Sequence, residues 1–326
     1  MDNKIDIKKH LNQAQNEVVA VLGDVMIDQY LTGEVGRISP EAPVPVVDIQ
    51  KKTYHLGGAA NVAHNLASLG CKPVMFGLLG NDNKAEHFIE ICKTMNIETD
   101  GLYKDKNRIT TVKTRIIGNN QQMLRIDNEV ITTIDEQGTD FILDKLTTLP
   151  QIDGILFEDY DKGTLNKTLI EKVIAFSKQQ NIPVFVDPKF KNFSYYNGAF
   201  IFKPNKKEIE NHIDKKLLTH EDIIAAGRFI KAKYDTRNVL ITLGEQGMIL
   251  FEDNNEIFSI PTIARKVADV SGAGDTTIST LCAMHLSGLD LRNACTIANI
   301  AAGIICQKPG VAAIEQNELI EGYYAN

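Results

Sequence analysis

The residue types best suited to chemistry lie in one segment, Asp269-Val270-Ser271-Gly272-Ala273-Gly274-Asp275-Thr276. Its composition predicts a tight Gly-rich turn that opens a helix, with a carboxylate on the first helical turn. The unpaired N–H groups and the dipole of a helix N-terminus form an anion site. Asp275 could then act as a general base toward an attacking hydroxyl, while the backbone of Gly272-Ala273-Gly274 holds a transferring phosphoryl group. An ordinary helix N-cap is the alternative interpretation, because Asp, Ser and Gly are common capping residues.

A second glycine-rich segment, Gly57-Gly58-Ala59-Ala60-Asn61, lies far upstream. It precedes apolar residues with helical spacing that end at Gly70, a residue type favoured just after a helix. Adjacent glycines allow the backbone to approach a ligand closely, and the Asn61 side chain can both donate and accept hydrogen bonds. These properties suit a polyol such as a sugar. A tightly packed junction between a strand and a helix is the alternative.

Two acidic residues follow the first candidate strand, Val18–Leu22. This continuous apolar run predicts a buried parallel strand, and ligands bind beyond the carboxyl ends of such strands. Asp24 and Asp28 are four residues apart, so both could face one pocket if a turn of helix follows Gly23. Their carboxylates would suit hydrogen bonds to sugar hydroxyls. Two solvated acids near a loop are the alternative.

Two later strand ends carry polar residues that suit a phosphorylated ligand. Lys189 follows the candidate strand 184–186 and could meet a phosphate, although a solvated lysine is the simpler interpretation. The segment Asn205-Lys206-Lys207-Glu208 follows the next strand and starts a helix. Asn205 and Glu208 have the spacing of a capping box, and the same residues could arrange Mg²⁺ and its waters beside a triphosphate.

Two features nearer the C-terminus are candidates for nucleotide contact. The segment from Thr242 to Gly247, which includes Gly244, follows a candidate strand and could either bracket a nucleotide or form an ordinary turn. Asn299 lies in an apolar helical stretch after the candidate anion site. It could contact the base of a nucleotide or be a satisfied core amide.

The remaining pattern predicts an α/β fold. Apolar segments alternate with stretches of helical periodicity, which indicates a mostly parallel central sheet with helices on both faces. Segments 29–56 and 109–127 break this pattern, and we expect them to form a small separate sheet, a lid over the site. Pairing with a second copy would protect the edges of this sheet and give a homodimer; surface hairpins without a role are the alternative. The predicted strands are 18–22, 74–79, 154–157, 184–186, 200–202, 239–242 and 248–251. The predicted helices are 83–95, 164–180, 219–234, 273–287 and 290–306, with a short helical piece at the C-terminus.

Composition excludes several classes of function. The chain has 326 residues, enough for one large domain over 1–326. Its net charge of −7 argues against a general nucleic-acid or anionic-membrane binder. The N-terminus lacks the apolar region of a signal peptide, and no apolar run approaches the ~20 residues of a membrane span, so we expect no membrane partner. Five cysteines without C-x-x-C spacing indicate free thiols in a reducing, cytoplasmic environment.

Taken in order, these segments resemble the ribokinase-like (PfkB) family of carbohydrate kinases over nearly the whole chain. The resemblance implies an enzyme that uses ATP and Mg²⁺ to phosphorylate a sugar hydroxyl, with Asp275 as the base and the glycine turn before it as the anion hole. Asn205 and Glu208 would belong to the ATP and Mg²⁺ site, and residues 242–247 would flank the nucleotide. A monovalent cation near Asp269 is a further candidate ligand. The residues that would hold the sugar are Asp24, Gly57, Gly58 and Asn61.

A narrower resemblance is to the D-glycero-D-manno-heptose-7-phosphate kinases. It implies phosphorylation of the anomeric hydroxyl, giving a 1,7-bisphosphate for lipopolysaccharide core synthesis, and it leads us to expect a stand-alone kinase without the nucleotidyltransferase that many relatives carry. A kinase for another sugar and a non-catalytic nucleotide or sugar sensor are the alternatives. The matching segments are Gly23–Tyr30, Arg37–Val46, Gly57–Gly70, Asp159–Gly163 and Val186–Lys189. Candidates to hold the 7-phosphate are Arg37, Arg115, Arg125 and Lys189, since cationic groups suit a phosphate.

Overall fold

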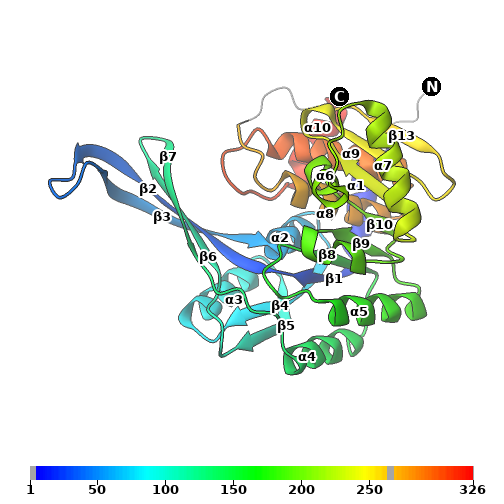
Figure 1. Cartoon of the computed structure of the whole chain (residues 1–326), viewed down its shortest axis with the longest axis horizontal. Helices are drawn as coiled ribbons and strands as arrows, with labels where there is room; N and C mark the ends of the chain where they lie inside the picture. The colour runs from blue at the N-terminus through cyan, green and yellow to red at the C-terminus, as the bar shows by residue number, and fades with distance from the viewer. Residues whose placement is uncertain (1–4, 263–267, 326) are drawn as a thin grey trace.

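The computed structural model describes residues 5–262 and 268–325, and it has the predicted α/β fold. Its main sheet has nine strands in the order β13-β12-β11-β10-β9-β8-β1-β4-β5 (Figure 1). Strand β12 runs antiparallel to β11 and β13, and the other neighbouring pairs are parallel. The strands are β1 (Val18–Gly23), β4 (Lys72–Gly80), β5 (Glu98–Asp105), β8 (Gly154–Glu158), β9 (Val184–Asp187), β10 (Ile201–Phe202), β11 (Asn238–Thr242), β12 (Met248–Phe251) and β13 (Ile257–Ile260).

Helices cover both faces of this sheet (Figure 1). The predicted helices are present, and α1, α4, β5 and β13 are additional elements that the sequence pattern did not reveal. The helices are α1 (Ile7–Ala14), α2 (Ala59–Ser68), α3 (Asn83–Thr94), α4 (Glu136–Thr147), α5 (Lys167–Gln180), α6 (Lys206–Ile213), α7 (His220–Lys233), α8 (Ala273–Leu286), α9 (Leu291–Ile305) and α10 (Gln316–Tyr324), with short 3₁₀ helices η1 (Phe190–Tyr195) and η2 (Gly244–Gln246).

The two helical layers follow from the alternation of side chains along buried strands. In β1, Val19 and Val21 pack into one hydrophobic cluster, and Ala20 and Leu22 pack into another on the opposite face. The first cluster includes residues of α1, α2, α3, α8, α9 and α10, and the second includes residues of α4, α5, α6 and α7. A strand that is apolar on both faces is therefore covered on both, as its continuous apolar run predicts.

The helices differ in whether a side chain caps their N-terminus, and this difference bears on function. Helices α2 and α8 begin at Gly58 and Gly272, and neither N-cap has a side chain to satisfy the first N–H groups of the helix. These are the two helices predicted from glycine-rich motifs. Most of the other helices begin at a side chain that accepts a backbone N–H group, namely Asp6, Asp82, Asp135, Asn166, Asn205, Thr219 and Asp290.

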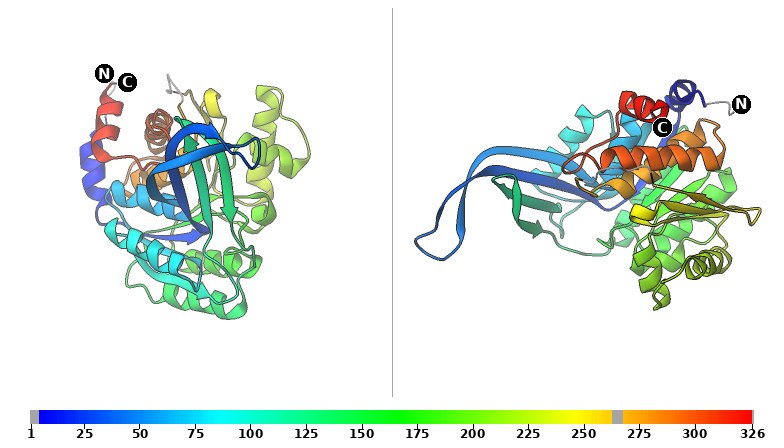
Figure 2. Two further views of the ribbon diagram at one scale, coloured as in Figure 1. Left: turned by 90° about the vertical axis from the view of Figure 1, so that its left-hand side faces the viewer. Right: turned by 90° about the horizontal axis from the view of Figure 1, so that it is seen from above.

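The two segments predicted to form a separate sheet do so. Strands β2 (Val25–Ile38), β3 (Pro45–Gly58), β6 (Val112–Gly118) and β7 (Gln121–Asn128) make a four-stranded sheet in the order β3-β2-β6-β7. This sheet, which we call the lid, projects from the body as an arm (Figures 1 and 2). The helical turn after Gly23 that could have brought Asp24 and Asp28 to one pocket does not form, because the chain enters β2 at Val25 and Asp28 therefore lies on a strand.

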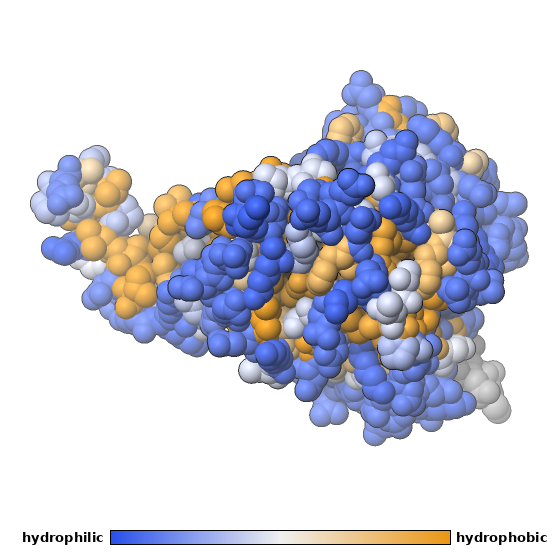
Figure 3. Space-filling view, turned by 90° about the horizontal axis from the view of Figure 1, so that it is seen from below, coloured by the Kyte–Doolittle hydropathy of each residue, from blue (hydrophilic) through white to orange (hydrophobic). Residues whose placement is uncertain are grey.

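The lid has two chemically different faces. Cross-strand register places Asp28 beside Lys113 and Asp127, and Tyr30 beside Arg115 and Arg125. We call this charged side the inner face, because the Tyr30 hydroxyl accepts the N–H of Val311 from the body at 3.3 Å. The opposite side, the outer face, carries Leu31, Ile116, Leu124 and Ile126. Figure 3 shows hydrophobic side chains along the arm.

Two sequence expectations, about membrane spans and about thiols, can be compared with the structure. In the described part of the chain, no helix is long and apolar enough to cross a membrane. All five cysteines are free thiols, as predicted; Cys306 is half-buried and the other four are buried. Burial raises the pKa of the Cys71 and Cys92 thiols to about 12, so these groups are unreactive near neutral pH.

Candidate active site

The carboxyl ends of four neighbouring strands, β8 to β11, face the N-terminus of α8 across one cavity of about 830 Å³. Ligands bind at this edge in open α/β sheets, because side chains and loops converge there. Each strand places its last residue, or the one after it, in the cavity wall. These residues are Glu158, Asp187, Lys203 and Thr242.

The N-terminus of α8 forms the opposite wall and has the properties of an anion site. Gly272 takes a left-handed backbone conformation, with φ +80°, and leads the chain into the helix. Among the described residues, the N–H groups of Gly274 and Asp275 have no hydrogen-bond partner. With the helix dipole, they present partial positive charge to the cavity. The Asp269 carboxylate does not cap them; it accepts the N–H of Ser271 at 2.9 Å and fixes the preceding turn.

Asp275 lies on the first turn of α8 and is only 6% exposed. Its Oδ2 accepts a hydrogen bond from Asn61 Nδ2 at 2.7 Å, and its Oδ1 accepts one from the Tyr160 hydroxyl at 3.1 Å. Burial raises the pKa of Asp275, and these two hydrogen bonds partly oppose the rise. A fixed carboxylate with a raised pKa, beside an anion site, is suited to take a proton from a hydroxyl.

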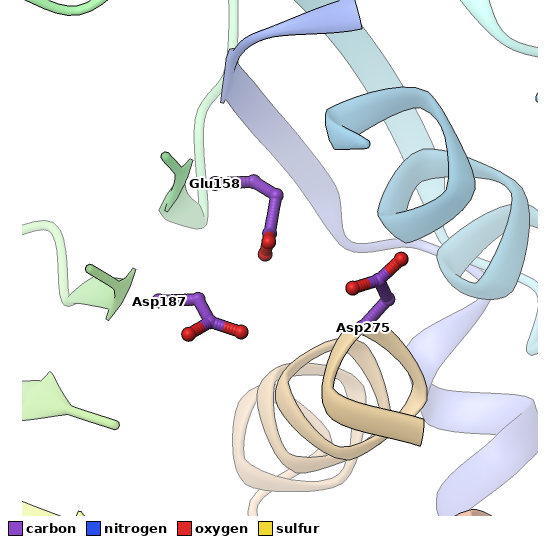
Figure 4. Close-up of side chains that lie close together, drawn as sticks. All are labelled: Glu158, Asp187 and Asp275. Atoms are coloured by element: carbon purple, nitrogen blue, oxygen red, sulfur yellow. The ribbon is translucent and has the colours of Figure 1, made fainter. Parts of the chain in front are cut away.

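Two more carboxylates converge on Asp275 (Figure 4). Glu158, Asp187 and Asp275 each have an oxygen within 4.8 Å of the others. Lys203 is buried beside them, with its Nζ 2.7 Å from Asp187 Oδ2. Burial, with the charges of Asp187 and Asp275, raises the pKa of Glu158 well above its usual value. One lysine thus faces three carboxylates, so the cluster must hold either excess negative charge or a proton.

A divalent cation would balance this excess negative charge. Glu158 Oε2 is buried and has no hydrogen-bond partner among the described residues. Mg²⁺ prefers carboxylate oxygens, water and substrate phosphates, so Glu158 and Asp187 could hold it directly or through water. Asn205 and Glu208 form the predicted capping box, and both Glu208 oxygens are engaged, one by the Asn205 N–H and one by Lys189. A role for Asn205 and Glu208 at the metal stays a prediction.

Asn61 is held in place by a polar chain that joins α2 to α8. The Asn65 side chain donates to the Asn61 carbonyl at 2.8 Å, and Asn65 Oδ1 accepts the Thr276 hydroxyl at 3.1 Å. Because Asn65 Oδ1 also accepts the N–H of Ile314 at 3.1 Å, the C-terminal segment is tied to the same point. The asparagine that contacts Asp275 is therefore positioned by three separate parts of the chain.

The Asp24 carboxylate forms hydrogen bonds within the protein. It is completely buried and accepts the backbone N–H groups of Tyr160, Lys162 and Thr164 at 2.9–3.0 Å. Asp24 thus shapes the loop after β8 and holds Tyr160 next to Asp275. Direct contact between Asp24 and a sugar stays a prediction.

Gly57 and Gly58 allow a close approach between protein atoms. A Cβ at Gly57 would overlap the Asp28 carboxylate, and a Cβ at Gly58 would overlap the Asp24 carbonyl. Gly58 also has φ +61°, a conformation that favours glycine. The tightly packed junction that we considered is therefore present, and contact of these glycines or of Asp28 with a sugar stays a prediction.

The residues expected near a nucleotide divide into two groups. Thr242, Gly244, Gly247 and Asn299 line the cavity, and Asn299 Nδ2 also donates to the Pro261 carbonyl at 2.7 Å, as a satisfied amide would. Lys206 and Lys207, in the first turn of α6, do not line it.

The four cationic candidates for the sugar phosphate are less available than the sequence suggests. Arg115 is paired with Asp28, Arg125 with Asp127 at 2.8 Å, and Lys189 with Glu208. Arg37 is exposed and lies opposite Val46 in the outer part of the β2–β3 hairpin. Of the four, only Lys189 lines the cavity, and their contact with a phosphate stays a prediction.

Sequence reasoning did not select Glu158, Tyr160, Asp187 or Lys203 as site residues. Glu158 and Asp187 end the buried strands β8 and β9, so the rule that drew attention to Asp24 would also have found them. Tyr160 carries no comparable signal, because its hydroxyl reaches Asp275 only through the loop that Asp24 shapes.

The chain belongs to the pfkB family of carbohydrate kinases, whose family model matches residues 16–317. It is therefore a sugar kinase by family. The bifunctional protein HldE of Helicobacter pylori (strain P12) is 41% identical to it over 305 residues, which is 93% of this chain and 66% of HldE. The chain thus spans slightly less than two thirds of that relative.

Solved structures agree on the fold. Phosphofructokinase-2 from Escherichia coli in complex with potassium has a TM-score of 0.78 at 16% identity, covering 95% of this chain and 98% of its own. Arabidopsis thaliana ribokinase complexed with ribose and ATP has a TM-score of 0.71 at 18% identity, covering 94% and 98%. At these identities the likeness shows the ribokinase-like fold alone.

Replacing Tyr160 with phenylalanine tests whether its hydroxyl tunes Asp275. Losing this hydrogen bond removes one group that lowers the pKa of Asp275, so the pKa should rise further. Since a base must be ionised to act, the acidic limb of kcat/KM against pH should move to higher pH.

Tyr196→Phe is the matched control. Its hydroxyl also donates to a buried carboxylate, that of Asp159 at 2.7 Å, which does not line the cavity. The pH profile of this control should keep its position. An unchanged acidic limb in Tyr160→Phe would contradict the tuning role.

Proposed function

We propose that this chain transfers the γ-phosphoryl group of ATP to the anomeric hydroxyl of D-glycero-D-manno-heptose 7-phosphate. The observation that carries the phosphoryl transfer is the buried Asp275 carboxylate beside the unpartnered N–H groups of α8. The choice of sugar is supported by the Arg37–Val46 string and the other segments that resemble the heptose-7-phosphate kinases. The 41% identity to relatives named HldE is consistent with it.

In this mechanism Asp275 accepts the C1 hydroxyl proton as the oxygen attacks the γ-phosphorus. Asn61 keeps hold of one carboxylate oxygen, and the other, which Tyr160 contacts in the free protein, turns to the sugar. The N–H groups at the start of α8 stabilise the negative charge of the transferring group. The lid covers the reactants and excludes water, which would otherwise accept the phosphoryl group.

ATP would lie along the wall formed by Thr242, Gly244, Gly247 and Asn299. When bound, Mg²⁺ supplies positive charge to the phosphates, and Glu158 and Asp187 would hold it. Lys203 would orient Asp187 for that role through the 2.7 Å contact between its Nζ and Asp187 Oδ2. Burial alone would lower the pKa of Lys203, but the charges of Asp187 and Glu158 raise it overall, so the lysine stays cationic. A monovalent cation near Asp269 belongs to the same proposal.

The lid would also carry a homodimer contact. Leu124 and Ile126 on its outer face are 55% and 48% exposed, and Leu31 and Ile116 lie beside them in register. Since these side chains are already about half-buried, complete burial of each would contribute roughly half of the 1.5–3 kcal/mol expected for a fully exposed one. A second copy of the same face is a suitable cover, since isologous contacts pair a patch with itself.

The substrate assignment is tested by ATP turnover on a sugar panel, with the product position determined by ³¹P NMR. The panel holds D-glycero-D-manno-heptose 7-phosphate, sedoheptulose 7-phosphate, fructose 6-phosphate, fructose and ribose. We expect selective formation of the 1,7-bisphosphate. Turnover of another sugar alone would discard the heptose assignment and keep the kinase, whereas no turnover on any sugar would favour a non-catalytic sensor.

Asp275→Asn tests the base. The amide keeps the size and can still contact Asn61 and Tyr160, but it cannot take up the proton, so kcat should fall by about 10²–10⁴ while sugar affinity is largely kept. Turnover and calorimetric sugar binding measure the two effects. Asp290→Asn, at the N-cap of the neighbouring helix α9, should behave as wild type. Near wild-type kcat in Asp275→Asn would refute the base assignment.

Leu124→Asp combined with Ile126→Asp tests the dimer contact. Charges on the outer face should disfavour its burial, so light scattering should show half the mass of the wild-type assembly at the same concentration. Leu218→Asp is the control, because Leu218 is 83% exposed and lies outside the lid. A double variant with the wild-type mass would argue against association through this face.

A further inference from the structure

One lysine on the inner face of the lid lacks an acidic partner. Lys113 is half-buried on β6, and within residues 5–262 and 268–325 no carboxylate lies at ion-pair distance from its Nζ. Burial lowers the pKa of Lys113, and the charge of Asp28 opposes this only in part. A cation in this position would be stabilised by an anion that the protein itself does not provide.

The acidic residues around Lys113 are already engaged. Asp28 and Asp127 flank it in register on β2 and β7, and they pair with Arg115 and Arg125. A third carboxylate, at the end of the lid, is that of Glu129, and it pairs with Lys162 at 2.6 Å. Within this group, four cationic side chains (Lys113, Arg115, Arg125 and Lys162) face three carboxylates, and among the described residues Lys113 is the one of the four without an ion pair.

Tyr160 connects this lysine to the catalytic centre. Its hydroxyl donates to Asp275 Oδ1 at 3.1 Å, and its ring centre lies 5.8 Å from Lys113 Nζ. Lys189 lies 5.4 Å from the same ring, but it is paired with Glu208. The side chain of one tyrosine thus bridges the base and the unpaired ammonium group, so a single sugar phosphate could contact both.

We propose that Lys113 binds the phosphate that the sugar already carries, remote from the hydroxyl that is phosphorylated. This inference rests on the proposed function and names a residue for substrate selection. The lid would then recognise a sugar monophosphate by charge, while Asp275 acts at the other end of the sugar. The lysine is better placed for this than Arg115 and Arg125, since the phosphate does not have to displace a carboxylate from it.

The test compares a phosphorylated sugar with its unphosphorylated form. Steady-state KM and kcat are measured for wild type, Lys113→Met and Lys113→Arg with D-glycero-D-manno-heptose 7-phosphate and with D-glycero-D-manno-heptose. Lys113→Met should raise KM for the phosphorylated sugar by roughly 10- to 100-fold, the loss expected for one charged hydrogen bond. KM for the unphosphorylated sugar and for ATP should change less than about twofold, and Lys113→Arg should recover part of the loss.

Lys52→Met is the matched control. Lys52 is also a lid lysine near a tyrosine ring, that of Tyr54 at 5.2 Å, but it pairs in register with Leu31 and so belongs to the outer side. Its KM values should equal those of wild type. Equal KM increases for both sugars in Lys113→Met, or no increase, would overturn the proposal.

The outcomes also separate this inference from the proposed function. If the enzyme uses a different sugar phosphate, the heptose assignment fails and the same comparison is made with that sugar and its unphosphorylated form. Turnover of unphosphorylated sugars alone would overturn the role of Lys113 and leave the kinase intact. If no sugar is turned over, calorimetric binding of the heptose 7-phosphate decides: weaker binding by Lys113→Met supports the inference, and equal or absent binding in both proteins overturns it.

Discussion

Buried negative charge that exceeds the positive charge around it is the constraint on which this site depends. Ionised carboxylates cost several kcal/mol to bury unless they are paired, yet Glu158, Asp187 and Asp275 meet at the ends of two strands and a helix. The Lys203 ammonium group offsets one charge, and the N-terminus of α8 offsets part of another. The remainder must be met by a proton on Glu158 or by a cation. Protonation and metal binding are therefore competing states of one cluster, and either one leaves Asp275 as the carboxylate held by hydrogen bonds rather than by a salt bridge.

The proposed base, Asp275, is positioned by a chain of contacts that begins at the carboxyl end of β1. Asp24 directly follows β1, and its carboxylate organises the loop after β8 by accepting three backbone N–H groups. That loop carries Tyr160, whose hydroxyl reaches Asp275. On the opposite side, the Asn61 side chain, from α2, donates to the same carboxylate. Helix α2 starts at Gly58, where only glycine suits both the positive φ of that residue and the close approach of the Asp24 carbonyl. Asp24 therefore acts on both supports of the base without touching it.

The sequence predicted the parts of this arrangement that depend on local pattern. Apolar runs located the buried strands, and glycine motifs located the two helices with uncapped starts, at Gly58 and Gly272. Pattern could not show that the Asp24 carboxylate turns inward to backbone N–H groups, since a polar residue after a strand has the same signature whether it faces a ligand or a loop. Nor could it distinguish Lys113 from Arg115, which lie two residues apart on one strand. Register places Asp28 beside Lys113, and only the side-chain contacts show that Asp28 pairs with Arg115 instead.

Strand register also explains how the lid can have a charged inner face and an apolar outer face. Successive residues of a strand face opposite sides, so Arg115 lies on the inner face of the lid and Ile116 on the outer face, and a slip of one residue would exchange the two faces. The irregular pairings in β2 and β6 begin at Thr32/Gly33 and at Ile116/Ile117, beyond the rows that hold Asp28 and Lys113. The cross-strand rows of charged residues beside the body are thus in regular register. The extra twist that bulges introduce is confined to the part of the arm farther from the body. A contact made through the outer face would consequently hold the inner face rigid as well, because the same four backbones carry both.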